Sequence, residues 1–148
     1  FKEGWGVQAG ADFRIHSNLT LLSDVRYADY ANISVWSVIP GARIHNDDQS
    51  QSLAIRLISI SPSDSDTRFG VSARYDGDLT PGFRLFGGAA SYTDTEAGVT
   101  RQLRSAFGGA SVTLADNVSM IATAEYDRRE QSYTRQAVNL ALIFRLGN

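Results

Sequence analysis

Charged residues recur two positions apart along several segments of this 148-residue sequence. Side chains at alternate positions of a β-strand point to one face, so each such pair would lie together on one side of a strand. A face that carries charges can form neutralising ion pairs or select charged solutes. The pairs are Asp12 with Arg14, Asp24 with Arg26, Arg74 with Asp76, and Glu125 with Asp127.

Apolar residues occupy the positions between these charges, which predicts strands rather than helices. In the opening segment, Trp5, Val7 and Phe13 alternate with Gln8 and Asp12. The same period recurs in about nine segments of about 9 to 13 residues, longer than the usual strand of about 5 to 6 residues. The segments fall within residues 4–16, 19–27, 36–45, 52–60, 68–76, 83–93, 103–114, 118–127 and 138–146. The predicted fold is therefore all-β, with antiparallel strands.

Clusters of turn-forming residues separate these segments. Within residues 52–60, Ile58 and Ile60 break the alternation, so we expect a β-bulge there. The turn clusters include Asn46-Asp47-Asp48, Asp76-Gly77-Asp78 with Pro81-Gly82, and Ala115-Asp116-Asn117.

Composition limits the classes of function open to the chain. The formal net charge is -2, so the basic excess that nucleic-acid binding requires is absent and no nucleic-acid partner is expected. The short basic run Arg128-Arg129 is expected in a solvated loop. The chain has no cysteine, which excludes disulfides and thiolate metal sites. It also lacks the run of about 18 apolar residues that predicts a transmembrane helix.

Two architectures fit the alternation. In a soluble barrel or sandwich the apolar face points to a core, whereas in a membrane barrel it meets lipid and the polar face lines the lumen. Small residues such as Ala73 and Ala122 on the apolar faces, charges on the polar faces, and aromatic residues such as Trp36 near strand ends favour the membrane barrel. The alternative is a soluble barrel or sandwich that binds a ligand or a protein partner.

The chain resembles bacterial outer-membrane β-barrel proteins of the porin kind, most specifically in its last segment, AVNLALIFRLGN at residues 137–148. The resemblance implies a location in the outer membrane, with outer-membrane lipid and the outer-membrane assembly machinery as partners. It also implies a passive pore, or the membrane-embedded part of an export or surface-assembly system.

The number of strands bears on how such a barrel closes. Barrels of this kind have an even number of strands, so about nine segments indicate that residues 4–16 lack a neighbouring strand. We therefore expect residues 1–148 to be a single β-barrel domain of about 8–10 strands or the C-terminal segment of a larger barrel. In the second case, upstream strands or other subunits would complete it. An eight-stranded barrel with one segment wrongly assigned near residues 46–66 is a further possibility, and a barrel of several chains is another.

The candidate site is the set of charged residues that would line the lumen. There they would set ion or sugar selectivity in an open pore, or pair and plug a small barrel. A purely structural role, in which they only hold the barrel together, is equally open. The set comprises Asp12, Arg14, Asp24, Arg26, Arg43, Arg56, Arg74, Asp76, Arg84, Glu125, Asp127 and Arg145.

No catalytic site is expected in the chain. Adjacent strand residues point to opposite faces, so His16 and Ser17 are not expected to pair as base and nucleophile. His45 could approach Ser50 or Ser52, but no spacing supports this. The chain is therefore predicted not to be an enzyme.

Metal and cofactor sites are not expected either. The acidic clusters lack the ligand series and the glycine of a calcium loop. The glycine pairs Gly87-Gly88 and Gly108-Gly109 do not lead into a helix, as a phosphate loop would. In a barrel wall they would permit sharp curvature or admit a side chain from the next strand.

Overall fold

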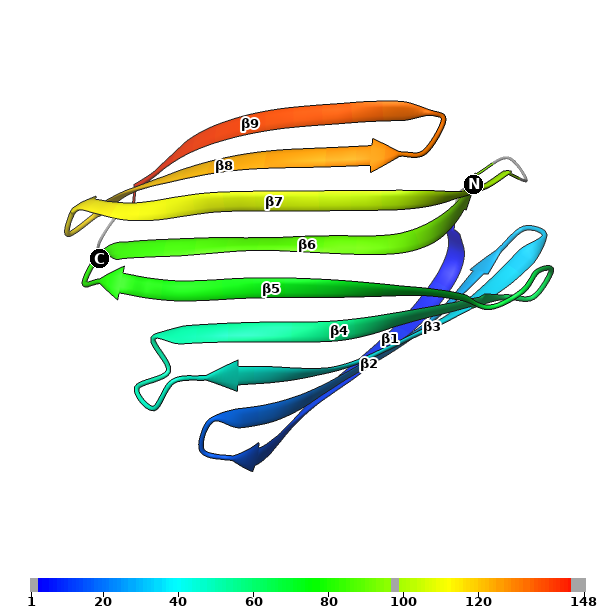
Figure 1. The fold of residues 1–148 in the computed structure, drawn as a ribbon, viewed down its shortest axis with the longest axis horizontal. Coiled ribbons are helices and arrows are strands. Elements are labelled where there is room, and N and C mark those ends of the chain that lie inside the picture. Colours follow the sequence, from blue (N-terminus) through cyan, green and yellow to red (C-terminus); the bar gives the residue numbers. More distant parts are fainter. Residues whose placement is uncertain (1–2, 97–98, 145–148) are drawn as a thin grey trace.

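The computed structural model describes residues 3–96 and 99–144, which form β-strands joined by turns (Figure 1). The strands confirm the predicted all-β class and correspond to the predicted segments. They have 12 to 17 residues each and are therefore longer than predicted. No helix in the described part of the chain is long and apolar enough to span a membrane. The strands are β1 (Glu3–His16), β2 (Leu19–Tyr30), β3 (Ile33–His45), β4 (Gln51–Pro62), β5 (Arg68–Thr80), β6 (Phe83–Glu96), β7 (Val99–Ala115), β8 (Val118–Arg129) and β9 (Tyr133–Phe144).

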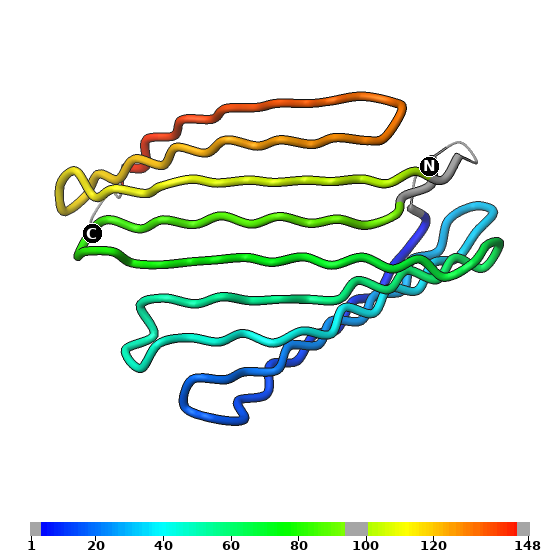
Figure 2. The backbone as a smooth tube through the Cα atoms, viewed as in Figure 1, coloured from blue at the N-terminus to red at the C-terminus, as the bar shows by residue number. Residues whose placement is uncertain are grey.

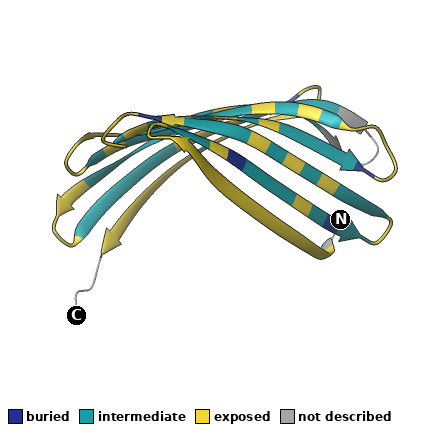
Figure 3. Ribbon diagram, turned by 90° about the horizontal axis from the view of Figure 1, so that it is seen from below, coloured by how far each residue is buried: buried dark blue, intermediate teal, exposed yellow. Residues whose placement is uncertain are grey.

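All nine strands belong to one sheet in the order β1 to β9, and each strand is antiparallel to the next (Figure 2). The eight-stranded alternative with a wrongly assigned segment near residues 46–66 is therefore wrong. Within the described residues, β1 and β9 each pair with one neighbour only, so the sheet is open at both edges. The sheet arches across its width, which gives it a concave and a convex side (Figure 3).

Apolar side chains cover the convex side of the sheet. Residues that face each other across antiparallel strands share a side, as Val7, Tyr27 and Trp36 do across β1, β2 and β3. Val138 is 83% exposed, and among the described residues only Leu22 and Ala28 are buried hydrophobic residues. A soluble sandwich would bury such a face against a second layer, but the described residues form a single layer. The convex side is therefore the face that meets lipid in a membrane barrel.

The exposed apolar residues of the convex side form a band across the sheet. This apolar band crosses the hydrogen-bonded rows of the sheet obliquely. One row starts at Phe13, near one end of the band on β1, and passes through Ile55 on β4. The same row reaches Tyr126 on β8 and ends at Gln136 on β9, beyond the other end of the band. Strands that stand at a tilt to the membrane, with a staggered register, produce this displacement, and barrel closure requires both.

The predicted bulge at Ile58 and Ile60 is wrong. The β4–β5 pairing keeps one register from Gln51 opposite Gly77 to Ile60 opposite Arg68. The alternation breaks for a different reason, because the concave side is itself apolar at this end of the sheet. There Ile58 and Ile60 are half-buried near Pro62 on the same strand.

Two further local predictions are also wrong. Asp76-Gly77-Asp78 is not a turn but lies within β5, and the chain reverses at Pro81-Gly82, where Gly82 has a φ of 80°. Arg128-Arg129 is not a loop either, since both residues pair with β9 at the end of β8. Asp76 and Asp78 lie on the concave side of β5, between Tyr75 and Leu79 of the convex side, whereas Arg128 follows the last apolar position of β8.

Two of the predicted glycine positions admit neighbouring aromatic rings. A Cβ atom at Gly88 would lie 2.7 Å from the Phe107 ring, and one at Gly109 would lie 2.6 Å from the Phe86 ring. The rings of Phe86 and Phe107 thus occupy the space left by the glycines opposite them on the adjacent strand. The expectation that these glycines admit a side chain is confirmed at these two positions.

Candidate functional site

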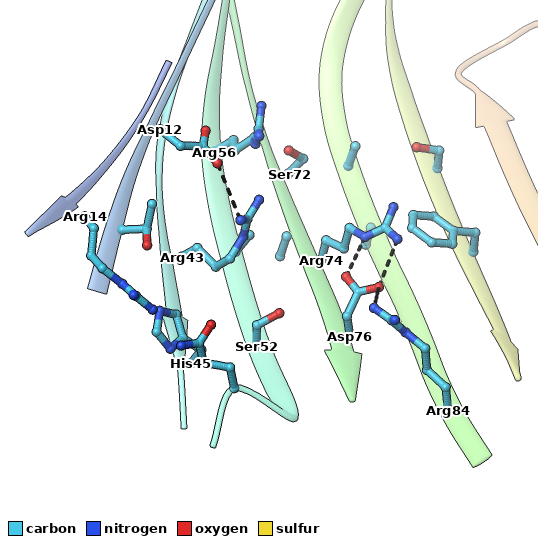
Figure 4. Close-up of a pocket in the computed structure, with 18 residues that line it drawn as sticks. Asp12, Arg14, Arg43, His45, Ser52, Arg56, Ser72, Arg74, Asp76 and Arg84 are labelled. Carbon is cyan, nitrogen blue, oxygen red and sulfur yellow. Dashed lines mark hydrogen bonds and ion pairs between the residues drawn. The ribbon is translucent and has the colours of Figure 1, made fainter. Parts of the chain in front are cut away.

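A groove of about 960 Å³ runs along the concave side and is lined by residues from β1 to β7 (Figure 4). Five arginines and two aspartates line it, so its charge is predominantly positive. The predicted alternation explains this arrangement, because the residues opposite the apolar band all point into the arch. The charged lining residues are Asp12, Arg14, Arg43, Arg56, Arg74, Asp76 and Arg84.

Asp76 is the centre of one charged cluster in the groove. Its carboxylate accepts hydrogen bonds from Arg74 Nε at 2.6 Å and Arg74 Nη2 at 2.9 Å. Arg84 Nη2 on β6 lies 3.3 Å from the same carboxylate, and Arg84 Nε lies 3.9 Å from Asp78. The Arg74 guanidinium also lies 5.7 Å from the centroid of the Phe107 ring, within cation–π range. Both arginines are therefore held in place while half of each side chain stays exposed.

A second charged cluster spans β1 to β4. Arg56 on β4 forms an ion pair with Asp24 on β2. To reach it, the Arg56 side chain crosses β3 at Gly41, where a Cβ atom would lie 2.6 Å from Arg56 Cγ. Glycine at position 41 is thus required for this pairing across two strands. Arg43 Nη1 lies 3.6 Å from Asp12 on β1.

Arg14 completes the positive lining at the end of the groove near the β1–β2 turn. Its side chain extends toward His45, which is buried to 8% exposure at the end of β3 (Figure 4). Arg14 makes no ion pair with any residue that the structure describes. Its charge is therefore the one in the groove that no described carboxylate offsets.

The concave side brings together most of the predicted lumen set. Arg26, Glu125 and Asp127 lie on the same side of the sheet, to judge from their partners across the strands. They are not among the residues that line the groove. Arg145 lies outside the described residues.

Sequence reasoning missed the aromatic part of this face. Phe107 lines the groove beside Arg74, although it was not among the candidate residues. Its position on β7 shares the alternation of Ser105 and Ser111, which both lie on the polar side. That parity, together with a glycine opposite it, is the signal that could have identified Phe107.

His16 and Ser17 lie within hydrogen-bond distance of each other, so the expectation that they point to opposite faces is wrong. Ser17 lies in the turn after β1, outside the strand alternation, and its Oγ is 3.0 Å from His16 Nδ1. The same Nδ1 lies 2.9 Å from Asn18 Oδ1, which can only accept a hydrogen bond. A proton on Nδ1 that is donated to Asn18 leaves no lone pair there to take the proton of Ser17. The geometry is therefore that of a hydrogen-bonded turn.

The β3–β4 turn closes one end of the groove and has its own hydrogen bonds. Ser50 donates its backbone N–H to Asp48 Oδ1 at 2.9 Å, and this bond holds the pKa of the exposed Asp48 carboxyl below its ordinary value. Asn46 Oδ1 accepts the N–H of Gln51 at 2.9 Å. Because the pKa of Asp48 is lower in the folded turn, its ionised carboxylate stabilises the turn at any pH above the ordinary carboxyl pKa. This stabilisation is lost only as the pH falls through the lowered pKa. The turn therefore keeps these bonds at neutral pH.

The described residues contain no group of three histidine, cysteine, aspartate or glutamate side chains that could hold a metal ion. His45 Nδ1 lies 3.4 Å from the carbonyl oxygen of Asn46. The polar side chains that line the groove carry guanidinium, carboxylate, hydroxyl, amide and imidazole groups.

No protein-family model matches the chain, and no curated protein matches it. Among solved structures, the chain is similar to the outer membrane channel DcaP of Acinetobacter baumannii, with a TM-score of 0.66 and 10% sequence identity. The match covers 84% of this chain and 44% of the DcaP chain. The chain thus spans less than half the length of the DcaP chain that it matches.

The similarity concerns the fold, which is that of part of an outer-membrane β-barrel channel. It confirms the predicted resemblance to outer-membrane β-barrel proteins and the predicted antiparallel barrel architecture. The exposed apolar side of the sheet agrees with the predicted location in the outer membrane.

Proposed function

We propose that this chain forms part of the wall of a pore-forming barrel in the bacterial outer membrane. The observation that carries the proposal is the contrast between the two sides of one sheet. The convex side exposes apolar residues such as Ile55, at 51%, and the concave side holds a groove lined by arginines. Only a barrel with lipid outside and water inside suits both sides at once.

Further strands are proposed to close the barrel. A sheet with two open edges would leave backbone groups without hydrogen-bond partners in hydrocarbon, where each such group costs several kcal/mol. Because β1 and β9 run in the same direction, antiparallel closure requires an odd number of added strands. These strands would come from the same polypeptide or from another subunit, so residues 1–148 are proposed to be a barrel segment.

The pore is proposed to let small anions diffuse passively. Arginines outnumber aspartates in the groove, and the clusters around Asp76 and Asp24 fix guanidinium groups without covering them completely. Fixed positive charges that line a water-filled channel lower the barrier for anions and raise it for cations. The lumen set of arginines and acidic residues would thus act as the selectivity-determining residues.

The full-length protein in a planar bilayer tests this function. We expect discrete channel openings, and in a gradient of potassium chloride we expect a reversal potential of the sign that marks chloride as the more permeant ion. The control is a mock preparation, purified in parallel from cells that do not express the protein. Absence of current from correctly folded barrels would contradict the pore and would favour a barrel plugged by its own ion pairs.

A further inference from the structure

Two arginines on the convex side lie outside the groove and outside the proposed pore. Arg104 on β7 and Arg128 on β8 are directly opposite each other in the β7–β8 pairing, and both are exposed. Like charges directly opposite each other on adjacent strands destabilise a sheet. Neither arginine makes an ion pair with a residue in the described part of the chain. Their positive charges are therefore not offset by an ion pair within the described residues.

The surroundings of the two arginines form a small hollow. Arg104 and Arg128 line a cavity of about 100 Å³ together with Gln102 and Glu130. The Gln102 amide already donates a hydrogen bond to Ser91 Oγ at 2.7 Å. Two guanidinium groups are thus left to bind an anion, and their fork geometry suits phosphate oxygens. The carboxylate of Glu130, which also lines the hollow, would oppose that binding.

The hollow lies at the boundary of the apolar band. On β8 the convex positions from Val118 to Tyr126 belong to the band, and Arg128 is the next residue on that side. On β7, Ala106 faces Tyr126 and Arg104 follows it. Tyrosine and arginine at the end of an apolar strand face mark the level of lipid headgroups. The two guanidinium groups therefore lie at the depth of lipid phosphates.

The polar extension of the strands indicates which leaflet is involved. Ser91 lies directly opposite Arg104, and beyond this pair the convex side of β6 and β7 continues with Thr93 and Gln102, which are also polar. At the opposite end, Leu114 and Val118 of the apolar band directly flank a two-residue turn at residues 116–117. Outer-membrane barrels have short turns on the periplasmic side and longer polar extensions outside. The hollow thus faces the outer leaflet, which consists of lipopolysaccharide.

We propose that Arg104 and Arg128 together bind a phosphate group of lipopolysaccharide on the outer surface of the barrel. This inference rests on the proposed membrane barrel but not on its being an open pore. Conductance and lipid binding are measured separately, so either can fail while the other holds.

Lipid binding by the full-length protein in detergent tests the proposal, with lipid A as the probe and native mass spectrometry to count bound molecules. Arg104→Gln and Arg128→Gln are each expected to weaken lipid A binding about tenfold, the effect of losing one hydrogen bond to a charged group. The matched control is Arg135→Gln, which removes an exposed arginine from the concave side of β9. Glu130→Gln is expected to strengthen binding.

Three results would overturn the proposal. The first is equal lipid A binding by Arg104→Gln, Arg128→Gln and Arg135→Gln. The second is unchanged binding of lipid A from which the phosphates have been removed. The third is arginine-dependent binding of phosphatidylglycerol that is as tight as that of lipid A, which would place the site in the other leaflet. Heat-modifiable electrophoretic mobility shows in each case that the variant barrel is folded.

Discussion

Arg74→Glu combined with Arg84→Glu is expected to convert an anion-preferring pore into a cation-preferring one. Both arginines converge on Asp76, so the double variant replaces a mainly positive cluster by three neighbouring carboxylates. In a narrow channel, the sign of the fixed charge decides which ion meets the lower barrier. The measurement is the reversal potential in a potassium chloride gradient, which should change sign.

Arg104→Glu combined with Arg128→Glu is the matched control for this experiment. It makes the same change in net charge on the convex side, outside the groove. Its reversal potential should stay close to that of the unmodified protein. If both double variants shift the potential equally, net charge rather than groove charge determines selectivity, and the assignment of the groove is contradicted.

Ile55→Arg is expected to destabilise the folded barrel by about 2 to 4 kcal/mol, the cost of arginine on the lipid face near the middle of the membrane. Ile55 lies on the convex side of β4 and is 51% exposed. In water, arginine at such an exposed position would change stability by about 0.5 kcal/mol or less. The size of the effect therefore reports the solvent that Ile55 contacts.

The control is Ala54→Arg, one residue earlier on the same strand. Ala54 lines the groove, so its arginine would stand in the water-filled lumen beside other charges. Equilibrium unfolding in urea, with the barrel reconstituted in lipid vesicles, measures both variants. A larger loss of stability for Ala54→Arg than for Ile55→Arg would mean that the two faces are assigned the wrong way round.

Much of the fold could be predicted from alternation alone. A strand with one face in lipid and the other in water repeats every second residue, and the segment from Trp5 to Ile15 keeps that period without interruption. The prediction failed where residues within a strand have the composition of a turn. Asp76-Gly77-Asp78 resembles a turn in composition, but its neighbours on β4 and β6 hold it in the sheet.

The sequence predicts which residues belong to the candidate site but not which of them contact each other. Parity alone places Arg56 and Asp24 on one side of the sheet. Their ion pair additionally depends on the register of three strands and on the missing side chain at Gly41. Registers depend on pairing between segments, which a single sequence does not state. The proximity of Phe107 to Arg74 escaped prediction for the same reason.

The central claim is that the convex side of this sheet meets lipid and the concave side meets water. The chain has no cysteine, so single cysteines can be placed at each of positions 52–57 on β4 and spin-labelled. With the full-length protein in lipid vesicles, labels at positions 53, 55 and 57 should collide with oxygen, which concentrates in hydrocarbon. Labels at positions 52, 54 and 56 should collide with a water-soluble nickel complex. Equal access of the nickel complex to all six positions, or the reverse alternation, would contradict the membrane barrel.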